Sequence, residues 1–400
     1  MKNVLIYLSA VLFFVFSTTE IYSCTSAIIT GKLTPDGRPL LWKHRDTGED
    51  NNRLEFFKGD KHNFIGLVNS PDEGGVVWIG TNSAGFSIMN TASYNLKDDD
   101  VKEMDQEGVF MFKALSVCSS LEEFEEFINN YPRPMRVEAN FGVIDSKGGA
   151  AYYEVNNHSF VKLDVNDPKI APLGYLVYTN FSYTGRFNEG MGYIRYMNAN
   201  TILSRKSSYG DITPHWIFNS LSRSFYHSLL DIDLSEKSLD SGWFIDMDFI
   251  PRRSSTASVI VQGVKNGESP DLTTMWTILG YPPTGVAVPA WVSAGGVLPS
   301  IAVKSDNTNN AYACDMALEL KYRIFPVERG SGKRYFKFNL IYNRDKTGYM
   351  QQLSSVDQYI FRLFKEPIER WRREGIDKKE LQLLYRDLDD SVIGAYSGIY

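Results

Sequence analysis

Cysteine is scarce in this chain. Its 400 residues include three cysteines, Cys24, Cys118 and Cys314, whereas exported proteins that depend on disulfides usually carry more, and an even number. One thiol is therefore left over by count, and Cys24 is the odd one by position. Cys118 and Cys314 either pair with each other or remain inert buried thiols, and a chain long enough for a real core favours the second.

Basic blocks and metal-ligand spacings are also lacking. The formal net charge is −6 and no run of Lys and Arg occurs, which argues against a nucleic-acid partner. The histidines, cysteines and acidic residues show no spacing such as Cys-x-x-Cys or His-Glu-x-x-His, so the sequence implies no metal and no other cofactor. Beyond the N-terminus, no apolar run reaches the roughly 20 residues of a membrane span.

What the N-terminus does contain is an export signal. Lys2 supplies a positive charge, Val4–Phe16 is apolar with two exceptions, and Ser17–Ser23 is more polar and ends in a small residue. The apolar run is short for a membrane span, so an N-terminal anchor is the weaker alternative. We expect residues 1–23 to be a cleaved signal peptide, 24–400 to be the mature domain, and the protein to be periplasmic or secreted.

Cleavage after Ser23 would make Cys24 the N-terminal residue. Such a residue carries a thiol nucleophile and a free α-amino base on neighbouring atoms. Reference pKa values are about 8.5 for a thiol and about 7.7–8.0 for an α-amine, so a small shift yields a thiolate near neutral pH. The amine can take the thiol proton and later protonate the leaving amine. This pattern favours an N-terminal-nucleophile amidohydrolase.

Groups of strands and helices follow Cys24. Residues 24–30 form a β-rich run, Thr34–Gly37 has the composition of a tight turn, and 39–46 is the expected return strand of a hairpin. Ser120 with Glu123 three residues later indicates a capping box that opens a helix. Further strands are expected at 64–68, 76–80, 85–90, 139–144, 150–155, 160–163, 175–180, 256–263 and 273–279, and helices at 107–118, 193–203, 216–224 and 356–373. Strands then helices, twice over, favour an α+β fold over regular βαβ alternation.

Several short segments, in order along the chain, resemble one family. They are Cys24–Ser26, Lys43–Asp46, Gly85–Asn90, Tyr178–Phe181 and Pro251–Thr256. Together they resemble the choloylglycine hydrolase and penicillin V acylase superfamily of N-terminal-nucleophile hydrolases. The Gly-Tyr-Pro-Pro segment within 276–291 is closer to the isopenicillin N acyltransferase-like branch. The resemblance covers most of 24 to about 300, and it implies a four-layer αββα fold with two antiparallel sheets between helices.

The resemblance also assigns catalytic roles. Cys24 would be the nucleophile and Asp46 the carboxylate that holds it. Asn90 and Asn180 would present side-chain amides to the site, where an amide can donate to a developing oxyanion. Asparagine is also common in turns at strand ends, which is the alternative for both.

Three basic residues complete the expected site. Arg253, with Arg252 as the fallback, would stabilise the aspartate and cysteine electrostatically; the alternative is a solvated pair of basic residues before a strand. Lys43 stands where the family has an arginine, and we assign it to substrate binding although lysine lacks the planar fork of arginine. Positions 43 and 46 of a regular strand face opposite ways, so the chain would have to turn or bulge near Arg45 for both to reach the cysteine. His44 is left outside the catalytic set.

The expected function is hydrolysis of linear, non-peptide amides through an acyl-enzyme on Cys24. The aromatic content of 14% and the resemblance favour an apolar acyl group, and bile salts, penicillins, N-acyl amino acids and fatty amides all stay open. Interception by an amine would make the protein an acyltransferase, but acyl-CoA is not expected outside the cytoplasm. The sequence leaves the oligomeric state open, and a homo-oligomer is one option because relatives are often dimers or tetramers.

A different class of protein remains open at the same residue. Ile21-Tyr22-Ser23-Cys24 partly resembles a lipobox. Lipidation of Cys24 on sulfur and acylation on nitrogen would remove both catalytic groups and leave a surface-anchored binding module. Tyr22 is bulky for that motif and the downstream segments would be unexplained, so we favour the enzyme.

Overall fold

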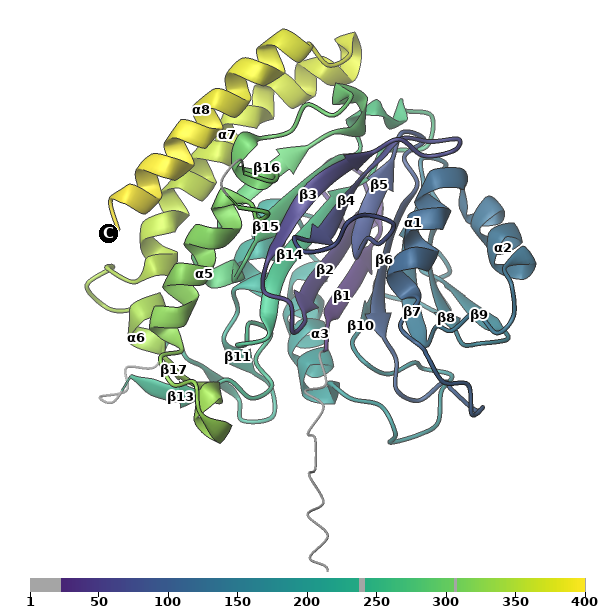
Figure 1. Ribbon diagram of the computed structural model, residues 1–400, viewed down its shortest axis with the longest axis horizontal. Helices are drawn as coiled ribbons and strands as arrows, with labels where there is room; N and C mark the ends of the chain where they lie inside the picture. Colours follow the sequence, from purple (N-terminus) through teal and green to yellow (C-terminus); the bar gives the residue numbers. More distant parts are fainter. Residues whose placement is uncertain (1–22, 237–241, 306–307, 400) are drawn as a thin grey trace, which may run out of the picture.

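Two antiparallel sheets form the centre of the molecule (Figure 1). The first consists of β1 (Thr25–Ile29), β2 (Leu40–Asp46), β10 (Tyr175–Tyr178), β14 (Ser255–Gln262), β15 (Thr274–Leu279) and β16 (Ala287–Ala290). The second consists of β3 (Asn52–Phe57), β4 (Phe64–Asn69), β5 (Ile79–Asn82), β6 (Ser87–Ala92), β7 (Ala139–Ile144), β8 (Ala150–Val155) and β9 (Phe160–Asp164). The strand order is β10-β1-β2-β14-β15-β16 in the six-stranded sheet and β3 to β9 in sequence in the seven-stranded sheet.

The computed structural model describes residues 23–236, 242–305 and 308–399. The expected signal peptide, 1–23, therefore lies outside the described residues except for Ser23. The helices are α1 (Glu107–Val117), α2 (Leu121–Asn130), α3 (Tyr193–Ser207), α4 (Pro214–Ile217), α5 (Tyr312–Ile324), α6 (Phe338–Ile341), α7 (Tyr349–Glu374) and α8 (Lys378–Ser397). Short ribbons pair β11 (Tyr226–His227) with β12 (Ile232–Asp233) and β13 (Trp243–Ile245) with β17 (Tyr335–Lys337).

Helices cover the outer face of each sheet. Alternation along β8 shows how the sequence produces these layers: Tyr152 belongs to the core between the sheets, whereas Tyr153 packs against Phe124 of α2 on the outer face. On the outer face of the six-stranded sheet, Trp291 packs against Phe364 of α7 and Tyr385 of α8. The order helix, sheet, sheet, helix confirms the α+β class and agrees with the four layers that the resemblance implied.

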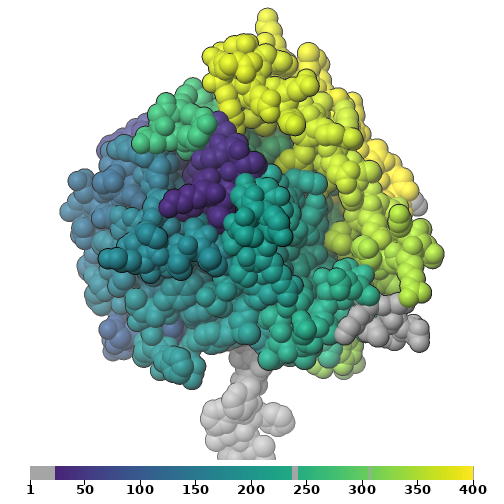
Figure 2. All heavy atoms as spheres, turned by 180° about the vertical axis from the view of Figure 1, so that it is seen from behind, coloured from purple at the N-terminus to yellow at the C-terminus, as the bar shows by residue number. Residues whose placement is uncertain are grey.

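The N-terminal hairpin is confirmed. β1 and β2 pair antiparallel, and the turn between them contains Gly37 at φ 70°, a left-handed conformation that glycine adopts without strain. Seen from behind, part of the N-terminal segment, in purple, reaches the surface (Figure 2). The backbone N–H of Ile212 donates to Leu33 O (3.0 Å) beside this turn. The opposite end of the hairpin, where Cys24 lies, is inside the molecule.

Some elements differ from the expectation. Several elements were not expected from the sequence, and β5 begins later than expected; the unexpected elements are β3, β16, α5, α6, α8 and the short strands β11, β12, β13 and β17. The buried residues Leu381, Tyr385, Leu388 and Val392 recur at helical spacing in α8, so that periodicity was available in the sequence. Ser120 caps α2 as expected by accepting from Glu123 N, but the Glu123 carboxylate bonds Ser119 N instead of closing the box on Ser120.

The tail of the chain belongs to this fold. α7 and α8 form a helical pair over β15 and β16, and their apolar faces are part of the main core. Within the three described ranges, no helix is both long enough and apolar enough to cross a bilayer.

Candidate active site

The end of β2 buries four consecutive ionisable residues. Lys43, His44, Arg45 and Asp46 are each at most 3% exposed, although such side chains are rarely buried unless they are paired. Thr25 pairs with His44 in the hairpin register, so the next residue towards the N-terminus, Cys24, lies across from Arg45. The fold thus gathers four ionisable side chains around the cysteine.

These four side chains divide between the two faces of β2. Lys43 and Arg45 contact the seven-stranded sheet, whereas His44 and Asp46 contact the start of β14. β2 keeps its alternation through position 45, and the irregularity lies in β14, whose register shifts by one residue. The expected bulge near Arg45 is therefore wrong: Cys24 sits at the strand end, where groups from both faces reach it.

Cys24 is the least buried of the three thiols, and it lines a cavity. All three cysteines lie within the described residues and are free, and Cys24 is half-buried whereas Cys118 and Cys314 are buried. Burial raises the pKa of Cys118 and of Cys314 to about 12, so both are inert thiols, as expected. The cavity beside Cys24 has a volume of about 480 Å³, and we call it the cysteine cavity. Its lining includes Cys24, Lys43, Arg45, Trp78, Asn90 and Glu107.

A buried lysine orients an asparagine in this cavity. Lys43 Nζ donates to Asn90 Oδ1 (2.7 Å) and to Trp78 O (2.6 Å). Because an ammonium group only donates, the carbonyl oxygen of the Asn90 amide must face Lys43. The Nδ2 group is then turned away and has no acceptor within the described part of the chain. Burial lowers the pKa of Lys43 to about 8, against the opposing charges of Cys24 and Glu107.

On the other face of β2, Asp46 is held by an arginine and a hydroxyl. Its carboxylate pairs with Arg252 and accepts from Ser255 Oγ (2.6 Å). Arg252 also donates to Ser23 O (2.8 Å). Burial by itself would raise the pKa of Asp46, but Arg252 first, then His44, lower it below its ordinary value. Asp46 is therefore a carboxylate at neutral pH. Its backbone O is 3.9 Å from Cys24 Sγ.

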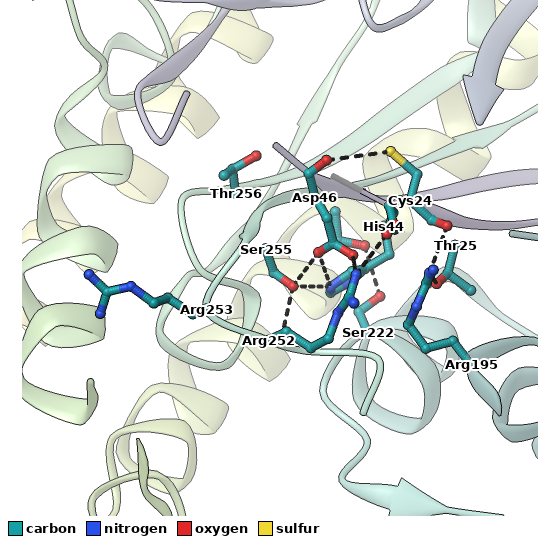
Figure 3. Close-up of polar contacts among 12 residues, drawn as sticks. Cys24, Thr25, His44, Asp46, Arg195, Ser222, Arg252, Arg253, Ser255 and Thr256 are labelled. Atoms are coloured by element: carbon teal, nitrogen blue, oxygen red, sulfur yellow. Dashed lines mark hydrogen bonds and ion pairs between the residues drawn. The ribbon is translucent and has the colours of Figure 1, made fainter. Parts of the chain in front are cut away.

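Arg252, and not Arg253, is the arginine that pairs with Asp46. Figure 3 shows Arg252 pointing into the cluster and Arg253 pointing away from it. Arg252 N–H donates to Ser255 Oγ (2.9 Å) and Ser255 N–H donates to Arg252 O (2.9 Å), which closes a turn. This turn directs the two neighbouring side chains to opposite sides. Arg253 instead donates to Phe325 O (3.3 Å), and its backbone N–H donates to Asp246 (2.8 Å).

Asn180 reaches the site through a residue that the sequence analysis missed. Arg195, near the start of α3, donates to Cys24 O (2.8 Å), Thr25 Oγ1 (2.7 Å) and Asn180 Oδ1 (2.9 Å). Asn180 is fully buried, and its Nδ2 donates to Ala92 O (2.8 Å). It does not line the cysteine cavity. No local motif marks Arg195 because only the packing of α3 brings it to Cys24.

His44 lies behind Asp46 and not on the cysteine cavity. Its Nε2 is 2.8 Å from Ser255 Oγ. Burial lowers the pKa of His44 to about 4, against the opposing charge of Asp46. The imidazole is therefore neutral at neutral pH and supports Asp46 and Ser255 without contacting the thiol.

A second cavity opens on the other side of the Ser23–Cys24 peptide bond. It has a volume of about 550 Å³, and its lining includes Ser23, Arg195, Asp246, Asp248 and Arg252. Ser23 lines this cavity and Cys24 lines the other, so the bond expected to be cleaved lies between them. Across the described residues, no group of three or more His, Cys, Asp and Glu side chains is arranged to hold a metal ion.

The sequence matches no family model and no curated protein. Among solved structures, a variant of the conjugated bile acid hydrolase from Clostridium perfringens is similar, with 13% identity and a TM-score of 0.42, over 67% of this chain and 92% of that chain. The penicillin V acylase from Agrobacterium tumefaciens is similar with 10% identity and a TM-score of 0.39, over 68% of this chain and 86% of that chain.

Proposed function

We propose that this protein is an exported amidohydrolase that cleaves linear, non-peptide amides with the Cys24 thiol at a processed N-terminus. One observation carries the proposal. Cys24, the only cysteine of the chain that is not buried, shares its cavity with Asn90, whose amide is oriented by Lys43. Nucleophile and oxyanion donor are two of the groups that acyl transfer requires.

The reaction proceeds through a thioester. The α-amine of Cys24 takes the thiol proton, and Sγ attacks the amide carbonyl carbon. The carbonyl oxygen becomes an oxyanion, to which Asn90 Nδ2 donates. The C–N bond then breaks as the amine returns the proton to the leaving nitrogen. Water attacks the thioester with the α-amine as base, and this releases a carboxylic acid and restores the thiol.

The arginine cluster prepares the base. Arg252 holds Ser23 O and Arg195 holds Cys24 O, so both guanidinium groups lie beside the bond whose cleavage creates the α-amine. A positive neighbour disfavours the protonated form of an amine, whereas the Asp46 carboxylate favours it. The two guanidinium groups thus favour the neutral amine, which is the form that a base needs, against the opposing charges of Asp46, Asp246 and Asp248.

The placement of Cys24 also favours an enzyme over a lipid-anchored protein. Cys24 is fixed directly at the start of β1, and Arg195 binds its carbonyl oxygen. A lipid chain on Sγ would have to fit inside the cysteine cavity instead of reaching a membrane. Trp78, Tyr94 and Met104 give this cavity an apolar part, which suits an apolar acyl group.

Cys24 substitutions test the proposal. We expect the exported wild type to begin at an unmodified Cys24 by intact mass and N-terminal sequencing. Cys24→Ala should fold but lose all turnover of any amide that the wild type cleaves. Cys24→Ser should keep only a small fraction of the activity, because a hydroxyl is far harder to ionise than a thiol. Cys118→Ala, at a buried thiol, is the matched control and should retain turnover. Equal activity of wild type and Cys24→Ala would refute the mechanism.

A further inference from the structure

Arg45 is a buried guanidinium without a carboxylate partner in the described part of the chain. It is 3% exposed. Its Nη2 donates to Asn69 Oδ1 (2.7 Å), but its buried Nη1 has no hydrogen-bond partner among the described residues. A buried charge is costly unless it is paired and hydrogen-bonded. The free Nη1 therefore points to a group that the protein alone does not supply.

This unpartnered donor lies beside the nucleophile. The register of β1 and β2 places Arg45 across from Cys24, and residues directly opposite in an antiparallel pair project to the same face. Both residues line the cysteine cavity. Arg45 Cζ also lies 5.0 Å from the ring centroid of Trp78, whose buried Nε1 has no hydrogen-bond acceptor among the described residues either. Two neighbouring residues that line the cavity thus each carry a buried donor without a partner, and one of the two is charged.

The other charged groups of the cavity do not satisfy Arg45. Lys43 competes for any negative charge on Cys24, because both cations face the same thiol. Glu107 accepts from Glu138 N (3.0 Å), and burial raises the pKa of Glu107 to about 7. Glu138 Oε1 accepts from two backbone N–H groups. Asp46 and Asp105 also line the cavity, and within the described residues none of these carboxylates accepts a hydrogen bond from the Nη1 of Arg45.

We propose that Arg45 is a specificity-determining residue that binds a carboxylate of the substrate. A carboxylate offers two acceptor oxygens, which match the free Nη1 of Arg45 and the free Nε1 of Trp78. The substrate is then an amide whose acyl half or amine half carries a carboxylate near the scissile bond. The inference deepens the proposed function and rests on it, since the substrate is the one that Cys24 attacks.

Two small alkylating reagents test the anion site without requiring turnover. Iodoacetate and iodoacetamide differ by the carboxylate and attack the same thiolate, so any change in thiol ionisation cancels in the ratio of their rates at Cys24. Arg45→Met should lower the iodoacetate-to-iodoacetamide ratio roughly ten- to hundredfold, since hydrogen bonds to charged groups are of that strength. Arg45→Lys should keep part of the preference. Arg386→Met, on the exposed face of α8, should leave the ratio unchanged.

The two failures can be told apart. A ratio that stays within threefold in Arg45→Met overturns the anion site whether or not any amide is cleaved. Loss of the amidohydrolase function shows instead as equal activity of wild type and Cys24→Ala.

Matched amides then identify which half carries the carboxylate. One pair is glutaryl p-nitroanilide and its carboxamide analogue, and the other is N-phenylacetylglycine and N-phenylacetylglycinamide. The wild type should favour the carboxylate member of one pair in kcat/KM, and Arg45→Met should abolish that preference. Equal kcat/KM for both members of both pairs would overturn the substrate class.

Discussion

Asn90 and Asn180 differ in what their side-chain amides contact. Among the described residues, the Asn90 amide is bound on its oxygen alone, by Lys43, and Asn90 lines the cysteine cavity. The Asn180 amide is bound on both ends, by Arg195 and by Ala92 O. A free N–H group can donate to a developing oxyanion at once, whereas an engaged one must first exchange a partner.

Substitution of each asparagine therefore has a distinct expected result. Asn90→Ala should lower kcat roughly 10²–10³-fold with a smaller change in KM, because an oxyanion donor acts in the transition state. Asn180→Ala should lower thermal stability through its lost buried hydrogen bonds, with a loss of kcat below tenfold. Steady-state kinetics measure the loss of kcat in each variant, and thermal unfolding measures the loss of stability. A loss of 10² or more in Asn180→Ala would restore the donor role expected from the sequence.

The neighbouring arginines make a second matched pair. Arg252→Met removes the cation that neutralises Asp46 and should lower the free energy of unfolding by about 3–5 kcal/mol, the cost of leaving a buried charge unpaired. Arg253→Met removes one side-chain bond to a backbone carbonyl and should cost about 1 kcal/mol or less. Urea unfolding at neutral pH compares the free energies of unfolding of the two variants. Equal losses would contradict the assignment of Arg252 as the partner of Asp46.

At the scale of elements, β2 concentrates charge inside the molecule. All seven of its residues are buried, and the last four are ionisable. The alternation of the strand sends Lys43 and Arg45 to the cysteine cavity and His44 and Asp46 to the arginine cluster. One strand thus contributes charged side chains to both sides of the site around Cys24.

The burial of His44 makes stability depend on pH. Its pKa is about 4 in the folded protein and 6.5 for an ordinary histidine. Between these values the unfolded chain binds a proton that the folded protein does not, so the free energy of unfolding falls as the pH decreases from 6.5 to 4. The fall from this residue is roughly 3 kcal/mol. Urea unfolding should show a smaller fall in the free energy of unfolding for His44→Gln than for the wild type between pH 6.5 and 4. Parallel plots of this free energy against pH would refute the expectation.

At the scale of the molecule, the C-terminal helices are tied to the sheet that carries Cys24. Asp357 of α7 pairs with Arg223 and accepts from Ala287 N (2.9 Å) at the start of β16. Both charged side chains are at most 5% exposed. The last fifty residues are therefore part of the main core and not an appendage.

This buried pair predicts a global effect. Asp357→Ala leaves Arg223 buried without its carboxylate and should lower the free energy of unfolding by about 3–5 kcal/mol. Asp387→Ala, at an exposed position of α8, should cost about 1 kcal/mol or less. We expect one cooperative urea transition in both variants. A separate early transition for the helical pair in the wild type would contradict a shared core.

The sequence by itself determined the hairpin and the groups that the hairpin brings together. A turn between two β-rich runs aligns residues twenty positions apart, so Cys24 meets Lys43 and Asp46 through local pairing alone. The α+β class and most strands follow from local periodicity in the same way.

Only the tertiary structure decided which distant residues complete the site. Arg195 and Arg252 reach the Ser23–Cys24 bond from segments more than 170 positions away, and Asn90 meets Lys43 across the two sheets. The direction of Arg252 instead of Arg253 depends on a turn closed by Ser255. Such contacts depend on the packing of layers, which no local pattern encodes, because burial and register in a sandwich are set by all strands together.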